Sequence, residues 1–270
     1  MESTKKLTAD VIVVGGGAAG MFAAIHAAQS GLHVLLLEKN PSCGKKLLIT
    51  GKGRCNVTNS CLPEDVLKNV PRNGRFLFSS VYSYPPERVM AFFEENGCAL
   101  KTERGNRVFP VSDRSADVLA ALERAMHRVG VVRRQANVTR FLTENGCITG
   151  VAAAGERYFS RAVILATGGA SYPLTGSTGD GYRLAAAVGH KIEAPTGSLV
   201  PLVSGDAACA QMQGLSLRNT GLRLLDARGK SVYTDFGELL FTHFGLSGPM
   251  ALSASAHMKQ GNAYTVVLYF

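Results

Sequence analysis

The stretch that decides the fold reads, from Asp10 to Asn59, DVIVVGGGAAGMFAAIHAAQSGLHVLLLEKNPSCGKKLLITGKGRCNVTN. It begins with a short β-branched run, passes through the glycine-rich segment GGGAAG, and continues into small residues up to Ser30. A second apolar run ends in Glu38, eighteen positions after Gly20. This order predicts a strand, a tight turn, a helix and a second strand, and it matches the dinucleotide-binding fingerprint.

Each part of the fingerprint has a physical task. Gly15 would allow the tight turn, Gly17 would let the backbone approach a pyrophosphate, and Gly20 would let the helix pack closely on the strand. The pyrophosphate would bind free N–H groups at the helix N-terminus. Glu38 would accept hydrogen bonds from ribose hydroxyls and repel a 2′-phosphate, which favours FAD or NAD over NADP. A glycine-rich turn without a ligand is the alternative interpretation.

The segment after Glu38, residues 39–59, is a polar and basic loop without an obvious strand–helix repeat. Such a loop could wrap an extended ligand from its ribose toward its reactive end. The run GKKLLITGKGRCNVTN in this loop, following GGGAAG and LLLEK, resembles the HI0933-like bacterial flavoproteins, a branch of the glutathione-reductase-type FAD proteins. The resemblance implies that the dinucleotide is FAD.

The same resemblance implies an α/β fold, in which a glutathione-reductase-type FAD/NAD(P)-binding Rossmann-like domain carries a small antiparallel layer and precedes a β-rich second domain. It also implies a backbone contact with adenine near Val138 and a second glycine turn at ATGG, residues 166–169. The full set of expected cofactor-binding residues is Gly15, Gly17, Ala18, Ala19, Gly20, Glu38, Lys39, Lys45, Lys46, Gly51, Gly53, Arg54, Cys55, Asn56, Val138, Thr167, Gly168 and Gly169.

The rest of the chain is predicted from its hydrophobic periodicity. Alternating residues at 131–134, 137–142, 147–153 and 157–159 predict the antiparallel layer, and the apolar run 162–166 predicts another buried parallel strand. A helix that begins near Ser115 is predicted to be part of the core. After a linker at 194–197, short strands at 199–203, 215–218, 221–226, 231–234 and 264–270 predict a sheet or barrel. We therefore expect an FAD-binding domain at 1–193 and the start of a β-rich domain at 194–270.

Composition and charge limit the class of protein. An apolar fraction of 46% with 18% charged residues is typical of a globular chain and excludes low complexity. Residues 11–37 carry no Asp, Glu, Lys or Arg, but five glycines and two histidines break them, so no membrane span is expected. The polar start MESTKKLTAD predicts a cytoplasmic protein. The net charge of +9 suits either an RNA partner or a solvated surface.

The six cysteines show no CxxC spacing and no accompanying histidine cluster, which argues against a metal site and against a disulfide framework. Cys55 and Cys61 could form a redox pair beside a flavin, but their spacing differs from that of flavin disulfide reductases. We expect Cys55 to line the flavin pocket. Cys55 and His243, the latter in the family-like run ELLFTHFGLSGP, are the candidate catalytic residues, although a packed structural histidine is the alternative for His243.

The resemblance implies an FAD-dependent oxidoreductase that passes hydride from NADH or NADPH through the flavin to an unsaturated substrate. Family members have been linked to reduction of steroid-type bile acids and of a uridine in ribosomal RNA. The alternative is a non-catalytic nucleotide- or RNA-binding module, or an inactive remnant. The sequence stops at Phe270 inside the apolar alternation AYTVVLYF, whereas family members continue and close over the flavin. We therefore expect weak or absent FAD retention and little turnover from these 270 residues alone.

Overall fold

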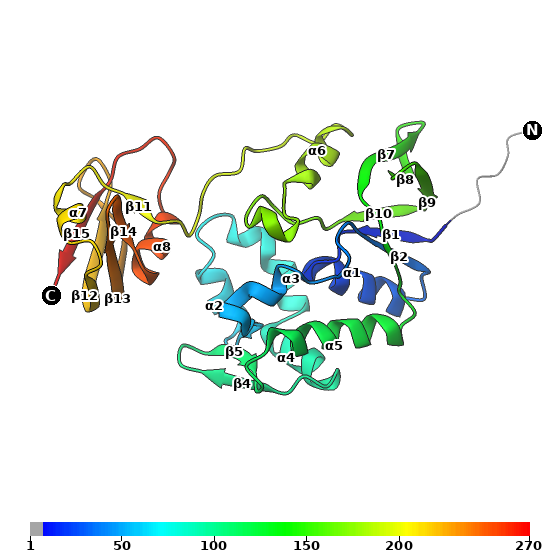
Figure 1. The fold of residues 1–270 in the computed structure, drawn as a ribbon, viewed down its shortest axis with the longest axis horizontal. Coiled ribbons are helices and arrows are strands. Elements are labelled where there is room, and N and C mark those ends of the chain that lie inside the picture. Colours follow the sequence, from blue (N-terminus) through cyan, green and yellow to red (C-terminus); the bar gives the residue numbers. More distant parts are fainter. Residues whose placement is uncertain (1–7) are drawn as a thin grey trace, which may run out of the picture. The chain divides into compact units, whose positions relative to one another are not determined.

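A parallel sheet of four strands organises the first part of the chain (Figure 1). The structure, a computed structural model, describes residues 8–270, so residues 1–7 of the predicted first domain lie outside it. The strand order is β10-β1-β2-β6, and helix α1 (Ala18–Gln29) connects the two central strands. The predicted strand, turn, helix and strand around GGGAAG are confirmed. The four strands are β1 (Val11–Val14), β2 (Val34–Glu38), β6 (Val132–Gln135) and β10 (Ala162–Leu165).

Side chains of the central strands alternate between two cores. Val13 and Leu36 pack with α1, α4 (Pro86–Glu95) and α5 (Ser115–Arg128), whereas Ile12 and Leu35 pack toward an antiparallel sheet. Figure 1 shows α1 and α5 on one side of the parallel sheet and the antiparallel layer on the other. Because both faces are covered, the strands read as unbroken apolar runs. The predicted layer is formed by β7 (Val138–Glu144), β8 (Cys147–Ala153) and β9 (Glu156–Phe159).

The prediction for residues 131–134 is wrong. They do not join the antiparallel layer but form most of β6, which pairs in parallel with β2 and brings Val132 opposite Leu35. β6 is an edge strand, and all four of its residues are exposed. An edge strand in contact with solvent can carry charged residues such as Arg133 and Arg134, so it lacks the continuous apolar run that marks a buried parallel strand.

Residues between β2 and β6 form mostly short elements. They include a small antiparallel sheet of order β3-β5-β4. In chain order, apart from α4 and α5, these elements are η1 (Leu47–Gly53), β3 (Thr58–Asn59), α2 (Pro63–Lys68), η2 (Gly74–Leu77), α3 (Phe78–Ser83), β4 (Leu100–Glu103) and β5 (Arg107–Pro110).

The contacts divide the chain into two units. Unit 1 contains the residues up to Val70 together with Gly74–Glu193, and its last elements are η3 (Pro173–Thr175) and α6 (Asp180–Ala186). Unit 2 contains Pro71–Asn73 and Ala194–Phe270.

Unit 2 is an antiparallel sheet of order β11-β14-β13-β12-β15, and helix α8 packs on its core. Residues 215–218 and 221–226, expected as two strands, form the single strand β12, because a β-bulge between Leu217 and Thr220 lets its pairing with β13 continue. The elements are β11 (Leu202–Val203), α7 (Ala208–Gln211), β12 (Ser216–Leu225), β13 (Ser231–Thr242), β14 (Gly245–Ser247), α8 (Pro249–Ser255) and β15 (Thr265–Tyr269). Across residues 8–270, no helix combines the length and apolar character that a membrane crossing needs.

Candidate functional site

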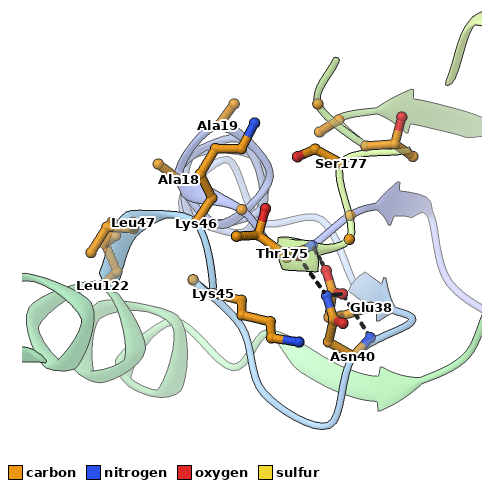
Figure 2. Close-up of a pocket in the computed structure, with 18 of the residues that line it drawn as sticks. Ala18, Ala19, Glu38, Asn40, Lys45, Lys46, Leu47, Leu122, Thr175 and Ser177 are labelled. Atoms are coloured by element: carbon orange, nitrogen blue, oxygen red, sulfur yellow. Dashed lines mark hydrogen bonds between the residues drawn. The ribbon is translucent and has the colours of Figure 1, made fainter. Parts of the chain in front are cut away.

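Unit 1 contains a cavity of about 640 Å³ (Figure 2). It is bordered by the residues that follow β1, β2 and β10, so it lies at the carboxyl ends of parallel strands, where open α/β sheets bind ligands. Its volume is in the range of cofactor sites. Among the residues predicted to bind the cofactor, those that line this cavity are Gly15, Gly17, Ala18, Ala19, Glu38, Lys39, Lys45, Lys46, Cys55, Asn56, Val138, Thr167 and Gly168.

The glycine-rich turn presents free backbone N–H groups to this cavity. Gly15 adopts a φ of +107° and donates its N–H to the Leu37 carbonyl at 2.8 Å. Helix α1 has no side-chain cap, and Met21 N–H donates back to the Gly17 carbonyl at 2.9 Å. The preceding N–H groups of Ala18 and Ala19 have no helical partner, and both residues are exposed. These groups and the helix dipole favour an anion here.

Glu38 ends β2 and is buried, with 7% of its surface exposed. Its Oε2 accepts a hydrogen bond from Gly16 N–H at 2.5 Å. Its Oε1 accepts two more from Asn40, one from the backbone N–H and one from Nδ2, both at 2.8 Å (Figure 2). Three donors therefore hold the carboxylate in place. Because each carboxylate oxygen has two lone pairs, Glu38 keeps acceptor capacity for hydroxyl groups of a ligand.

Three lysines line the cavity, and they differ in the hydrogen-bond and ion-pair partners of their ammonium groups. Lys39 Nζ contacts Asp180 Oδ2 at 2.7 Å and Thr178 Oγ1 at 2.8 Å. The hydrogen bond from Lys39, followed by that from Thr178, lowers the pKa of the Asp180 carboxyl. Lys46 Nζ donates to Ser171 Oγ at 3.1 Å. Lys45 is exposed and has no ion pair with any residue from 8 to 270, so its ammonium group is available to an anion.

Part of the cavity has apolar walls. In Figure 2, Leu47 and Leu122 lie on the opposite side of the view from Glu38 and Asn40, with Lys45 between the two groups. Leu122 was expected as a core residue of α5, and it is buried, but it also borders this space. An apolar wall suits the flat ring system of a cofactor rather than its phosphates. We call this part of the cavity the apolar arm. The residues that line it are Phe22, Leu47, Val57, Val89, Phe93, Val118 and Leu122.

Cys55 lines the cavity and is buried, with 6% of its surface exposed. Its φ of +60° is unusual for a residue other than glycine. Burial raises the pKa of the Cys55 thiol, so the thiol keeps its proton at neutral pH. Cys61 does not line the cavity, and neither cysteine forms a disulfide. The geometry therefore favours a protonated thiol over a redox pair.

This burial predicts slow alkylation. In the folded chain, Cys55 is expected to react with iodoacetamide much more slowly than the exposed Cys147, because the reactive thiolate is scarce and access is blocked. Peptide mass spectrometry at successive times measures both rates. Urea should remove the difference, and equal rates in the folded chain would contradict the assignment.

Five of the predicted cofactor-binding residues do not line the cavity: Gly20, Gly51, Gly53, Arg54 and Gly169. Arg54 instead bonds to Glu103 and donates from Nε to Asp113 Oδ1 at 2.8 Å, and its guanidinium lies 4.1 Å from the Phe109 ring centroid. His243 is exposed in the turn between β13 and β14 of unit 2, with its ring centroid 5.0 Å from that of Phe244.

The ion pairs of Arg54 predict a pH-dependent contribution to stability. The pKa of Glu103 is lowered by Arg54, and that of Asp113 is lowered by Lys101 and then by Arg54. Carboxyls with depressed pKa values stabilise the fold above their ordinary values of 4.5 and 3.8, and this stability is lost as the pH falls through the folded-state values.

Arg54→Met is therefore expected to lower the urea midpoint at neutral pH, and its difference from wild type should shrink in acid. Because Asp113 is exposed and Arg54 and Glu103 are only half-buried, solvent reaches all three groups, and added salt should reduce the effect. FAD binding should be unchanged, because Arg54 lies outside the cavity. A difference in midpoint that is constant with pH, or a loss of FAD binding, would contradict this structural role.

Sequence reasoning missed several polar residues that line the cavity, above all Asn40, Thr175, Ser177 and Asp180. Asn40 could have been predicted as a site residue, because it follows Glu38 by two residues at the carboxyl end of a strand, where ligands bind. The segment 176–181 is a glycine-rich turn before a helix, but nothing local indicates that it reaches residues 38–40. In the described part of the chain, no three His, Cys, Asp or Glu side chains come together as metal ligands.

Comparison with known sequences identifies relatives. A family model described as the HI0933-like protein Rossmann domain matches residues 9–240. A 3-dehydro-bile acid delta(4,6)-reductase from Clostridium scindens is 33% identical over 257 residues, which cover 92% of this chain and 60% of the relative. A ribosomal RNA dihydrouridine synthase from Escherichia coli is 26% identical over 262 residues, which cover 96% and 63%. The chain thus spans about three fifths of the length of these relatives.

Solved structures share the fold. A flavocytochrome c3 fumarate reductase aligns with a TM-score of 0.56 at 21% identity, covering 79% of this chain and 47% of that chain. A 3-ketosteroid delta1-dehydrogenase from Sterolibacterium denitrificans aligns with a TM-score of 0.56 at 17% identity, covering 83% and 63%. At these identities the likeness supports the Rossmann-like α/β fold alone.

Proposed function

The chain belongs to the HI0933-like family, and we propose that its protein is an FAD-dependent oxidoreductase whose FAD binds in the cavity of unit 1. The observation that carries this proposal is the combination of groups around that single space. Unpaired N–H groups at the start of α1 suit a pyrophosphate, the fixed carboxylate of Glu38 suits ribose hydroxyls, and the apolar arm suits a flat ring system.

Bound FAD would supply hydride transfer. The names of two relatives, a bile acid delta(4,6)-reductase and a ribosomal RNA dihydrouridine synthase, both denote saturation of a carbon–carbon double bond. They support an unsaturated substrate for this protein, either a steroid-like enone or a uridine in ribosomal RNA. We propose NADH or NADPH as the reductant.

Residues of this chain would perform the remaining tasks. Lys45 would compensate phosphate charge, and Leu47 and Leu122 would exclude water from the ring system. Cys55, whose thiol keeps its proton at neutral pH, is a candidate to hold a proton at Sγ for the reduced substrate. His243 is the second candidate, on the basis of its sequence motif.

The test is anaerobic mixing of FAD and the protein, extended past Phe270 to the length of its relatives, with NADH or NADPH, with and without an unsaturated bile acid or ribosomal RNA. The proposal predicts bleaching of the visible flavin bands faster than for free FAD, and recovery of the bands when the correct substrate is added. Bleaching no faster than that of free FAD would contradict the proposal. Salt-dependent RNA binding without any effect on FAD would instead support a non-catalytic RNA-binding module.

A further inference from the structure

We propose that residues 173–180, here called the clasp, close over the Glu38 end of the cavity and set the lifetime of the bound dinucleotide. The clasp consists of η3 and the turn that leads to the first residue of α6. Lys39 and Asn40, directly after Glu38, hold it in place. This inference rests on the proposed function, because it takes FAD as the ligand.

The first contact is a closed polar triangle. Lys39 Nζ donates to Asp180 Oδ2 at 2.7 Å and to Thr178 Oγ1 at 2.8 Å, and the Thr178 hydroxyl donates to Asp180 Oδ2 at 2.8 Å. The side chains of Lys39 and Asp180 are only 28% and 32% exposed, so solvent screens the pair incompletely. Because the Lys39 ammonium is bonded within the clasp, its main role is to hold the clasp rather than to bind a phosphate.

The second contact connects the clasp to the ribose acceptor itself. Asn40 Nδ2 donates to Glu38 Oε1 at 2.8 Å and also lies 3.3 Å from the Thr175 carbonyl oxygen. Figure 2 shows Thr175 beside Asn40 and Glu38. One amide group therefore positions the carboxylate and holds the clasp at the same time, so Asn40 is a positioning residue for both.

The third contact is a close approach of backbone to side chains. Gly176 has a φ of +96°, and a Cβ atom there would lie 2.7 Å from Asn40 Nδ2 and 3.2 Å from Lys39 Cε. No other residue type would fit without displacing these side chains. At Gly176 the clasp thus lies directly against the side chains of residues 39 and 40.

Apart from these polar contacts, the clasp is held by little burial of apolar side chains. Leu174 is 92% exposed, and Tyr172, just before the clasp, is 66% exposed. Ser177 is buried, and the Gly179 N–H donates to the Gly169 carbonyl at 3.2 Å, which anchors the end near α6. The polar contacts with Lys39 and Asn40 therefore keep the other end closed. A segment held by few contacts can open locally without unfolding of the unit.

A clasp has a kinetic signature that a direct ligand contact lacks. Loss of a direct contact speeds release and leaves association nearly unchanged. Loss of a contact that holds a barrier closed speeds release and association together, so the equilibrium affinity changes less than either rate.

The test uses Lys39→Met, Asp180→Asn and the double variant of the protein extended past Phe270 to the length of its relatives, with FAD fluorescence followed by stopped flow. Each single variant is expected to raise the release rate about tenfold, the effect of losing one charge-assisted hydrogen bond, and to raise the association rate as well. The double variant should be no faster than either single one, because both changes break the same contact. Lys39→Arg should restore slow release.

Lys68→Met is the matched control. It removes a lysine–carboxylate pair of similar length, 2.8 Å to Asp65, on α2 and outside the cavity lining, and it should leave both rates unchanged. If wild type binds FAD but the Lys39 and Asp180 variants release it at the wild-type rate, or if their effects multiply, the clasp is wrong and the proposed function stands. If wild type binds no FAD, the proposed function fails and the clasp fails with it.

Discussion

Replacing Gly17 with alanine is expected to preserve the fold and to weaken FAD binding by about 100-fold, the equivalent of one or two hydrogen bonds to a charged group. The φ of Gly17, −76°, suits alanine, and an added Cβ would meet no atom within 4 Å. That open space lies where the pyrophosphate would approach the N–H groups of Ala18 and Ala19. The methyl group would block this approach without disturbing the packing.

Gly20→Ala is the matched control, because it should affect the fold first. A Cβ on Gly20 would lie 1.8 Å from the Gly15 carbonyl oxygen, a distance that neither backbone can accommodate. Urea unfolding and FAD titration of both variants separate the two glycines. Wild-type FAD affinity in Gly17→Ala, or a large loss of its stability, would contradict the assigned role of Gly17.

Replacing Glu38 with alanine is expected to weaken FAD binding by about 100-fold or more and also to lower the free energy of unfolding. Its carboxylate accepts hydrogen bonds from Gly16 and Asn40, and it is buried. Removing the carboxylate leaves a buried N–H group at Gly16 without a partner, which costs about 1–3 kcal/mol. The ribose of the ligand would lose its acceptor as well.

Glu38→Gln separates the two effects. The amide keeps one acceptor oxygen, toward either Gly16 or Asn40, and turns its NH₂ group toward the donors of the other, so stability and binding should both fall between wild type and Glu38→Ala. Urea unfolding measured beside FAD titration tests this order. Full FAD affinity in Glu38→Ala would show that the ligand does not reach this end of the cavity.

The glycine-rich turn and Glu38 could be predicted from the sequence because their signature is local. The tight turn and the close helix each require a glycine, and the second strand ends in an acid, all within thirty residues of Asp10. The antiparallel layer was equally predictable from its alternation. Strand β6 was not, because an exposed edge strand carries Arg133 and Arg134 in place of the apolar run that indicates a buried neighbour.

Other parts of the site depend on contacts that local patterns do not reveal. Arg54 belongs to a basic loop next to the predicted site, but which way it points depends on acids of β4 and the loop after β5, 49 and 59 residues away. The clasp bonds to Lys39 and Asn40 across 135 to 141 residues. Leu122 has the periodicity of any core helix, and only the assembled unit shows that it also borders the cavity.

The central claim is that the cavity of unit 1 binds FAD through Glu38 and the start of α1. Its most direct test is a calorimetric titration with FAD of the protein extended past Phe270 to the length of its relatives, with Gly17→Ala measured in parallel. We predict saturable, equimolar binding to the wild-type chain and at least about 100-fold weaker binding to a variant that unfolds at the wild-type urea concentration. No saturable binding to wild type, or equal affinity for both chains, would contradict the claim.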